Sequence, residues 1–148
     1  MDDNVRKGVN VELPRGVYFI GDIGYALPDD IYYSFWIEGN NGKNGKYVTA
    51  NGGIFAVSST LYGDGGFPGS NGFIYGCDSG TIGIISKNLV RKSKDISKRF
   101  WKNDAGTFHN WSEPILFTEL NGLFTFKEVQ SGKILLQIET GDNDHPWT

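Results

Sequence analysis

Glycine is the residue that most limits what this chain can fold into. The 148-residue sequence holds 21 glycines, and eight of them lie in one stretch, LYGDGGFPGSNGFIYGCDSGTIGII, from Leu61 to Ile85. Glycine destabilises helix interiors but suits tight turns, and short runs of β-branched and aromatic residues lie between these glycines. The pattern predicts many short strands joined by turns. Gly83, inside the apolar run IGII, further indicates a sharp bend or a close approach of another backbone.

Turn signals separate the expected strands. Asn51-Gly52, Asn121-Gly122 and Ser131-Gly132 each lie between apolar runs and are typical of hairpin turns. Near the N-terminus, Pro14-Arg15-Gly16 separates GVNVEL from GVYFIGD. Because a turn between two such runs is typical of a hairpin, we expect these two strands to pair with each other.

Two segments predict short helices. Pro28 suits the first position of a helix, and acidic residues follow it where the helix dipole favours them, which predicts a helix ending near Gly39. A second segment, from Ser86 to Trp101, places apolar residues at helical spacing among charges and predicts one helix or two short ones. The expected fold class is therefore α+β, mainly antiparallel β, as a sheet sandwich or partly open barrel with one or two short helices.

The chain is expected to form a single globular domain over residues 1–148, with short flexible ends near 1–8 and 142–148, because no repeat or linker divides it. Its N-terminus shows no apolar run of the signal-peptide kind, and no stretch is long and apolar enough to span a membrane. Cys77, the one cysteine, cannot form an intrachain disulfide and is expected to be a small buried hydrophobic residue. These features predict an intracellular protein that does not enter a membrane.

Charge is unevenly distributed along the sequence. The net charge is −3, yet seven of the fourteen basic residues lie between Lys87 and Lys102. Such a segment can attract phosphates or nucleic acid, with Lys94, Lys98 and Arg99 as the candidate contacts, or it can be a solvated helix face that keeps the protein soluble. The sequence leaves both interpretations open.

Three short motifs resemble those of a known group of proteins. GDIGYAL (Gly21 to Leu27), YGDG (Tyr62 to Gly65) and DSGTIGII (Asp78 to Ile85) are similar to motifs of an uncharacterised family of small β-rich proteins from bacteriophages, bacteria and large DNA viruses. The resemblance covers about half of the chain. It implies a compact β-rich fold, is compatible with a viral origin and supplies no activity.

Three aspartates are the candidate catalytic residues. Asp22, Asp64 and Asp78 each lie beside glycine at an expected junction of strand and loop. If these loops meet, the carboxylates could serve a small metal-dependent or acid/base hydrolase. Alternatively, each aspartate hydrogen-bonds the backbone of its own turn. Because no EF-hand, zinc-site or P-loop pattern is present, we expect no cofactor and assign no metal ligands.

Aromatic residues give the favoured functional hypothesis. Tyr33 and Trp36 lie on the first expected helix, and aromatic side chains of this kind either make a binding surface where they are exposed or cover the open ends of a barrel. We therefore expect a non-enzymatic interaction or structural protein, plausibly viral, that forms a homodimer or binds a protein partner. A viral protein of this kind would act in the host cytoplasm or nucleus, or in the virion.

Overall fold

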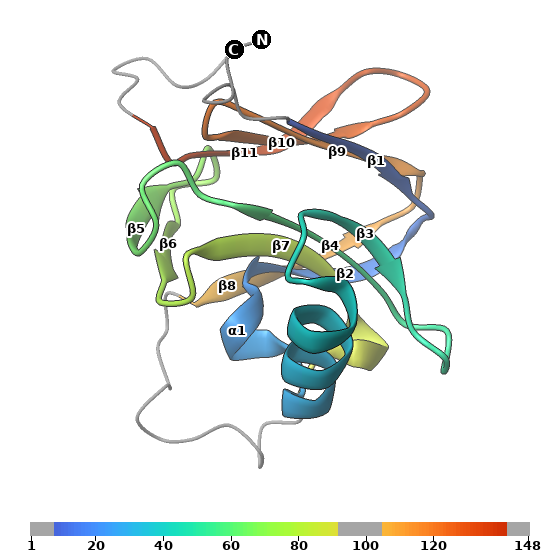
Figure 1. Ribbon diagram of the computed structural model, residues 1–148. Helices are drawn as coiled ribbons and strands as arrows, with labels where there is room; N and C mark the ends of the chain where they lie inside the picture. The colour runs from blue at the N-terminus through green and yellow to red at the C-terminus, as the bar shows by residue number, and fades with distance from the viewer. Residues whose placement is uncertain (1–7, 92–104, 142–148) are drawn as a thin grey trace, which may run out of the picture.

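The computed structural model describes residues 8–91 and 105–141. The basic candidates Lys94, Lys98 and Arg99 lie outside the described residues, as do residues 1–7 of the expected flexible end near 1–8 and all of the one near 142–148. Strands make up about half of the described chain and are arranged in two large antiparallel sheets and one small ribbon (Figure 1).

The three sheets have simple strand orders. The four-stranded sheet runs β1 (Val9–Leu13), β9 (Ile115–Leu120), β10 (Leu123–Glu128) and β11 (Ile134–Glu139). The five-stranded sheet runs β3 (Gly45–Val48), β4 (Ile54–Ser59), β7 (Thr81–Ser86), β2 (Gly16–Asp22) and β8 (Gly106–Trp111). The ribbon consists of β5 (Gly65–Pro68) and β6 (Ile74–Cys77).

Within the described residues, three short helices accompany the strands. They are α1 (Ile23–Ala26), the wide π-type helix η1 (Asp30–Glu38) and the 3₁₀ turn η2 (Lys87–Leu89). Figure 1 shows α1 and η1 on the side of the five-stranded sheet that faces away from the four-stranded sheet. The described part of the molecule is therefore layered as sheet, sheet and helices.

Each space between two layers holds its own hydrophobic core. Side chains alternate along a strand, so Ile20 of β2 packs between the two sheets whereas its neighbour Phe19 packs on the helix side. Ile84 and Ile85 of β7 divide in the same way. Because the central strands are buried on both faces, they are apolar almost without interruption.

The expected fold class is confirmed, and the structure decides between its two forms. Both large sheets have two outer strands and neither closes on itself, so the fold is a sandwich and not a barrel. The predicted turns at Asn51-Gly52, Asn121-Gly122 and Ser131-Gly132 connect β3 to β4, β9 to β10 and β10 to β11. The first predicted helix is confirmed as η1. The second predicted helical segment is described only as far as residue 91, and within that part the short η2 is helical.

The predicted N-terminal hairpin is wrong. β1 pairs with β9, whereas β2 pairs with β7 and β8, so Pro14-Arg15-Gly16 carries the chain from one sheet to the other. A turn signal marks a change of direction but does not select the partner strand. β2 is largely buried, and its position between β7 and β8 gives it a hydrogen-bonded neighbour strand on each side.

None of the helices in residues 8–91 and 105–141 is long and apolar enough to cross a lipid bilayer.

A row of three glycines runs across β7, β2 and the outer strand β8 of the five-stranded sheet. Gly21 of β2 lies opposite Gly83 of β7 on one side and opposite Gly106 of β8 on the other. A Cβ atom at Gly83 would lie 2.3 Å from the carbonyl oxygen of Ala56 and 2.6 Å from a methyl group of Ile23. This confirms the expected close approach at Gly83. Because Gly83 has no side chain, Ile23 of α1 packs directly on β7, and the residue of β2 that follows Gly21, Asp22, begins the helix as its N-cap.

Candidate functional site

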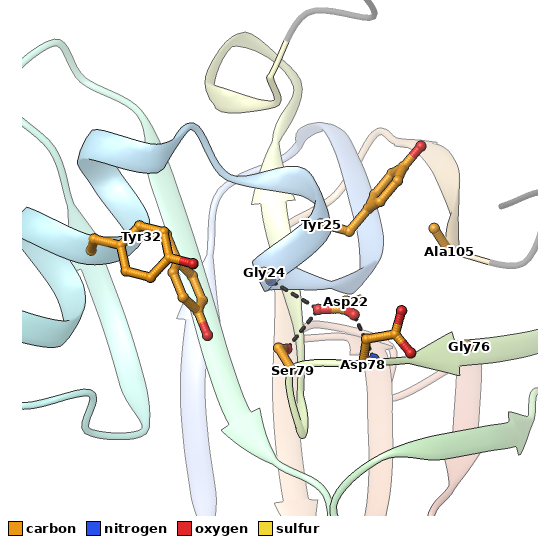
Figure 2. A pocket seen from close by; sticks show the side chains of 9 residues that line it. Asp22, Gly24, Tyr25, Tyr32, Gly76, Asp78, Ser79 and Ala105 are labelled. Atoms are coloured by element: carbon orange, nitrogen blue, oxygen red, sulfur yellow. Dashed lines mark hydrogen bonds between the residues drawn. The ribbon is translucent and has the colours of Figure 1, made fainter. Parts of the chain in front are cut away.

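Asp22 is the centre of the candidate site. It is the last residue of β2 and the N-cap of α1, and it is only 4% exposed. Its Oδ1 accepts hydrogen bonds from the backbone N–H of Gly24 at 2.8 Å and from the hydroxyl of Ser79 at 2.6 Å. Its Oδ2 accepts a hydrogen bond from the backbone N–H of Asp78 at 2.8 Å. The carboxylate therefore ties α1 to the turn between β6 and β7, as Figure 2 shows.

Local sequence explains why the turn reaches this carboxylate. Gly80 has a φ of +75°, in the left-handed region that glycine adopts without strain, and it closes the turn before β7. Gly24 gives the turn room, because a Cβ atom there would lie 2.8 Å from Cβ of Ser79. The hydroxyl of Ser79 is also 2.7 Å from the hydroxyl of Thr81, so its position is fixed from both sides.

A pocket of about 230 Å³ opens above Asp22. Three tyrosines line it together with two acidic residues: Tyr25 of α1, Tyr32 and Tyr33 of η1, Asp22, and Asp78 of the turn. In Figure 2, Asp22 lies between α1 and the turn, with Tyr25 and Tyr32 on opposite sides of it. The rings of Tyr32 and Tyr33 meet edge to face with their centroids 4.8 Å apart. The pocket thus combines aromatic walls with an acidic floor.

Tyr25 and Tyr32 of the pocket are neutral at physiological pH. Burial raises the pKa of Tyr32, and the nearby negative charge of Asp22 raises it further. Burial also raises the pKa of Tyr25, against a smaller opposite effect of Arg91. Both hydroxyl groups therefore keep their protons and can donate hydrogen bonds.

The three motifs that carried the family resemblance meet at this place. Asp22, Gly24 and Tyr25 belong to GDIGYAL, and Asp78 and Ser79 belong to DSGTIGII. YGDG also approaches the turn, because a Cβ atom at Gly80 would lie 3.7 Å from Oδ1 of Asp64. The first and second motifs are about 40 residues apart in the sequence, and the second and third about 15. The fold brings all three to one small region.

The candidate aspartates have different surroundings. Asp22 and Asp78 come together at the pocket, where the backbone N–H of Asp78 donates a hydrogen bond to the side chain of Asp22. Asp64 lies beside the same turn without lining the pocket. Within residues 8–91 and 105–141, no group of three or more His, Cys, Asp or Glu side chains is arranged to hold a metal ion. The described geometry thus gives the shared-cation hypothesis no support.

Nucleophilic catalysis also finds little support in the described residues. Cys77 is 2% exposed, and burial followed by the charge of Asp22 raises the pKa of its thiol to about 12. His109 of β8 bonds through Nε2 to the hydroxyl of Thr107 at 2.6 Å, and burial lowers the pKa of its ring. His109 does not line the pocket, so Ser79 has no histidine base among the described residues of the site.

The predicted aromatic residues divide between surface and core. Tyr33 is 56% exposed and lines the pocket, in agreement with a role at the surface. Trp36 is 3% exposed, packs in the helix-side core and donates its ring N–H to the carbonyl oxygen of Lys43. Its assignment as a binding residue at the surface is therefore corrected. Sequence reasoning missed Tyr25 and Ser79, although both lie inside the motifs that it had singled out.

Cys77 should be almost unreactive in the folded protein. A thiol with a pKa of about 12 is thiolate at only about one part in ten thousand at pH 8, and burial blocks access to it. We expect labelling by a colorimetric disulfide reagent at pH 8 to be at least about a hundredfold slower than for an unfolded control. Labelling should become fast in concentrated denaturant. Equally fast labelling of the folded and denatured protein would contradict this placement of Cys77.

Comparisons with known protein-family models, with curated proteins and with solved structures found no significant match for this chain. The resemblance to the uncharacterised viral and bacterial family therefore stays a prediction, and the function has to be argued from the geometry of the pocket.

Proposed function

We propose that this protein is a non-enzymatic binding protein and that the pocket above Asp22 receives a cationic side chain from a protein partner. One observation carries the proposal: the Asp22 carboxylate is buried and accepts three hydrogen bonds. Such a carboxylate supplies a fixed negative charge at the floor of the pocket. The three hydrogen bonds fix the orientation of its two oxygens against α1 and the turn.

The walls of the pocket favour the same class of ligand. Tyrosine rings attract ammonium and guanidinium groups through their faces, and a nearby carboxylate strengthens the attraction. Tyr25, Tyr32 and Tyr33 supply such rings around Asp22 and Asp78. A lysine or arginine side chain would therefore find both aromatic contact and opposite charge.

The size of the pocket favours one inserted side chain over a larger free ligand. Its volume of about 230 Å³ lies below the roughly 300 to 1,000 Å³ of pockets that bury whole small-molecule ligands. The inserted side chain would then act as the anchor residue of a protein interface, a single buried side chain that contributes much of the affinity. This is the partner-binding function expected from the sequence, with the pocket as its contact point.

The other hypotheses have less support. A hydrolase built on Asp22, Asp64 and Asp78 would need at least one of these carboxylates to act as a base or metal ligand, and Asp22 is already engaged. Phosphate or nucleic-acid binding through Lys94, Lys98 and Arg99 stays a prediction from the sequence. A viral origin also stays a prediction. Action inside a cell fits a chain whose one cysteine, Cys77, is a buried thiol.

A titration with capped amino acids tests the proposal. We expect N-acetyl-lysine amide and N-acetyl-arginine amide to shift the amide NMR signals of Gly24, Tyr25 and Ser79, with dissociation constants on the order of 1 mM, as for a weak single-group contact. The neutral analogue N-acetyl-norleucine amide has nearly the same shape as the lysine derivative and should cause no comparable shift.

Two variants provide the controls. Tyr32→Ala removes an aromatic wall and should weaken the binding of the lysine derivative about fivefold to tenfold, the effect of losing one cation–π contact. Ile74→Ala changes an exposed side chain outside the pocket and should leave binding unchanged. Equal shifts with the lysine and norleucine derivatives would show that the pocket does not select a cation.

A further inference from the structure

The outer strands of the two large sheets are protected in different ways. At β11, Gly69 forms a bridge to Ile138, and Ser70 exchanges hydrogen bonds with the backbone of Gln137. At β1, the ammonium group of Lys46 donates a hydrogen bond to the carbonyl oxygen of Glu12. Each of these two edges thus has at least one contact that covers or caps its backbone.

The two outer strands of the five-stranded sheet differ from each other. β3 has four residues and carries the charged Lys46, and short charged edges resist pairing with other chains. β8 has six residues, Gly106–Trp111, and contains neither a charged residue nor a proline. β8 is therefore the outer strand best suited to accept another strand.

The register of β8 shows which of its backbone groups point outward. The N–H of Asp22 donates to the carbonyl of Ala105 at 3.2 Å, so these two residues form a hydrogen-bonded pair in the ladder between β2 and β8. Bonding alternates along an antiparallel pair, so Thr107, His109 and Trp111 also bond toward β2. The backbone N–H and C=O groups of Gly106, Phe108 and Asn110 then face away from the sheet. No hydrogen bond to these outward groups occurs in the described part of the chain.

We propose that β8 pairs in antiparallel fashion with β8 of a second copy of this chain, about a two-fold axis at Phe108. In this register Phe108 lies opposite Phe108 of the second copy, and Gly106 lies opposite its Asn110. The three outward-facing pairs then exchange about six hydrogen bonds. The two five-stranded sheets join into one continuous sheet.

The side chains of β8 fit this arrangement on the face that carries Phe108. Phe108 is 56% exposed, and its ring meets Phe19 edge to face at 5.2 Å. Its counterpart across the axis covers the exposed part of the ring, and a pair of aromatic side chains directly opposite each other stabilises a sheet. Gly106, which lies opposite Asn110 of the other copy, adds no side chain of its own, and the ring of Phe19 fills its side-chain position, 2.4 Å from where a Cβ atom would lie.

The opposite face of β8 presents no obstacle to pairing. Thr107 and His109 lie opposite each other across the axis, and His109 is already hydrogen-bonded to Thr107 of its own chain. Burial lowers the pKa of His109, so its ring is uncharged at neutral pH. Each chain has a net charge of −3, yet this contact brings no two like charges together. A second copy is for these reasons the partner that the edge fits.

Short-range crosslinking tests the register. In a Phe108→Cys variant the two new thiols lie across the axis with Cβ atoms about 5 Å apart, within reach of a short thiol-specific crosslinker. In an Asn110→Cys variant the equivalent atoms are about 14 Å apart, because four residues of strand separate them. We expect the first variant to form covalent dimers at least tenfold faster than the second. Cys77 is buried and should give no dimer in the unchanged protein.

Light scattering of the unchanged protein provides an independent test. Its mass should rise from 16.4 kDa toward twice that value as its concentration increases. Asn110→Pro removes only an outward N–H and should abolish the rise, whereas Asn110→Ala should preserve it. A mass near 16.4 kDa at every concentration, or equal crosslinking of the two cysteine variants, would overturn the proposal. Neither measurement depends on a cationic ligand. The test of dimer formation through β8 is therefore independent of the test of cation binding in the pocket.

Discussion

Replacing Gly21 by alanine should lower the free energy of unfolding by about 3 kcal/mol or more, because the new methyl group would have no space. Its Cβ atom would lie 2.1 Å from the carbonyl oxygen of Ala105 and 2.8 Å from Cα of Gly106. Both neighbours are backbone atoms, one of the first residue of β8 and one of the residue before it, so no side-chain rotation can relieve the overlap. β2 and β8 would have to separate at the residue that precedes Asp22.

A matched control lies at the other end of the same strand. A Cβ atom at Gly16 would meet only the ring of Tyr18, at 3.5 Å, which is an ordinary contact distance. Gly16→Ala should therefore change stability by less than about 1 kcal/mol in either direction. Urea unfolding followed by tryptophan fluorescence would measure both variants. A Gly21→Ala protein as stable as Gly16→Ala would contradict the tight packing of the glycine row.

The local part of the fold could be predicted from the sequence, whereas the long-range pairing could not. Asn51-Gly52 and Asn121-Gly122 determine hairpins through their own backbone preferences, so a short window of sequence is enough. The partner of β1 is β9, about 105 residues away in the chain. That pairing depends on which strand completes the buried face of the four-stranded sheet, and no local signal encodes it. The predicted hairpin across Pro14 failed for this reason.

The candidate site was predictable only in part, for a similar reason. Asp22 and Asp78 were found because an acidic residue beside glycine at the end of a strand is visible in the sequence. The role of Ser79 depends on a contact with Asp22 across 57 residues, which appears only when the turn folds against α1. Trp36 was assigned to the surface because the aromatic content of a helix does not reveal which face packs against the sheet. Burial against Phe55 and its neighbours decides that question.

The second large effect is expected from the loss of the Asp22 carboxylate. Asp22→Ala should lower the free energy of unfolding by about 3 to 5 kcal/mol, because it leaves the N–H groups of Gly24 and Asp78 and the hydroxyl of Ser79 without their acceptor. Asp22→Asn keeps the shape and one oxygen acceptor, but its NH₂ group would face the N–H donor of Asp78. We expect it to cost about 1 to 3 kcal/mol.

Exposed aspartates of the same region supply the controls for Asp22. Asp64→Ala and Asp78→Ala keep the backbone donors of the turn and the Asp22 carboxylate, so each should cost less than about 1 kcal/mol. Thermal unfolding of all four variants, together with amide NMR spectra, would separate the effects. In Asp22→Ala the largest spectral changes should occur at Gly24 and Ser79, where α1 separates from the turn. If Asp22→Ala were no less stable than Asp78→Ala, the carboxylate would not hold α1 to the turn, and the proposed binding pocket would lose its structural basis.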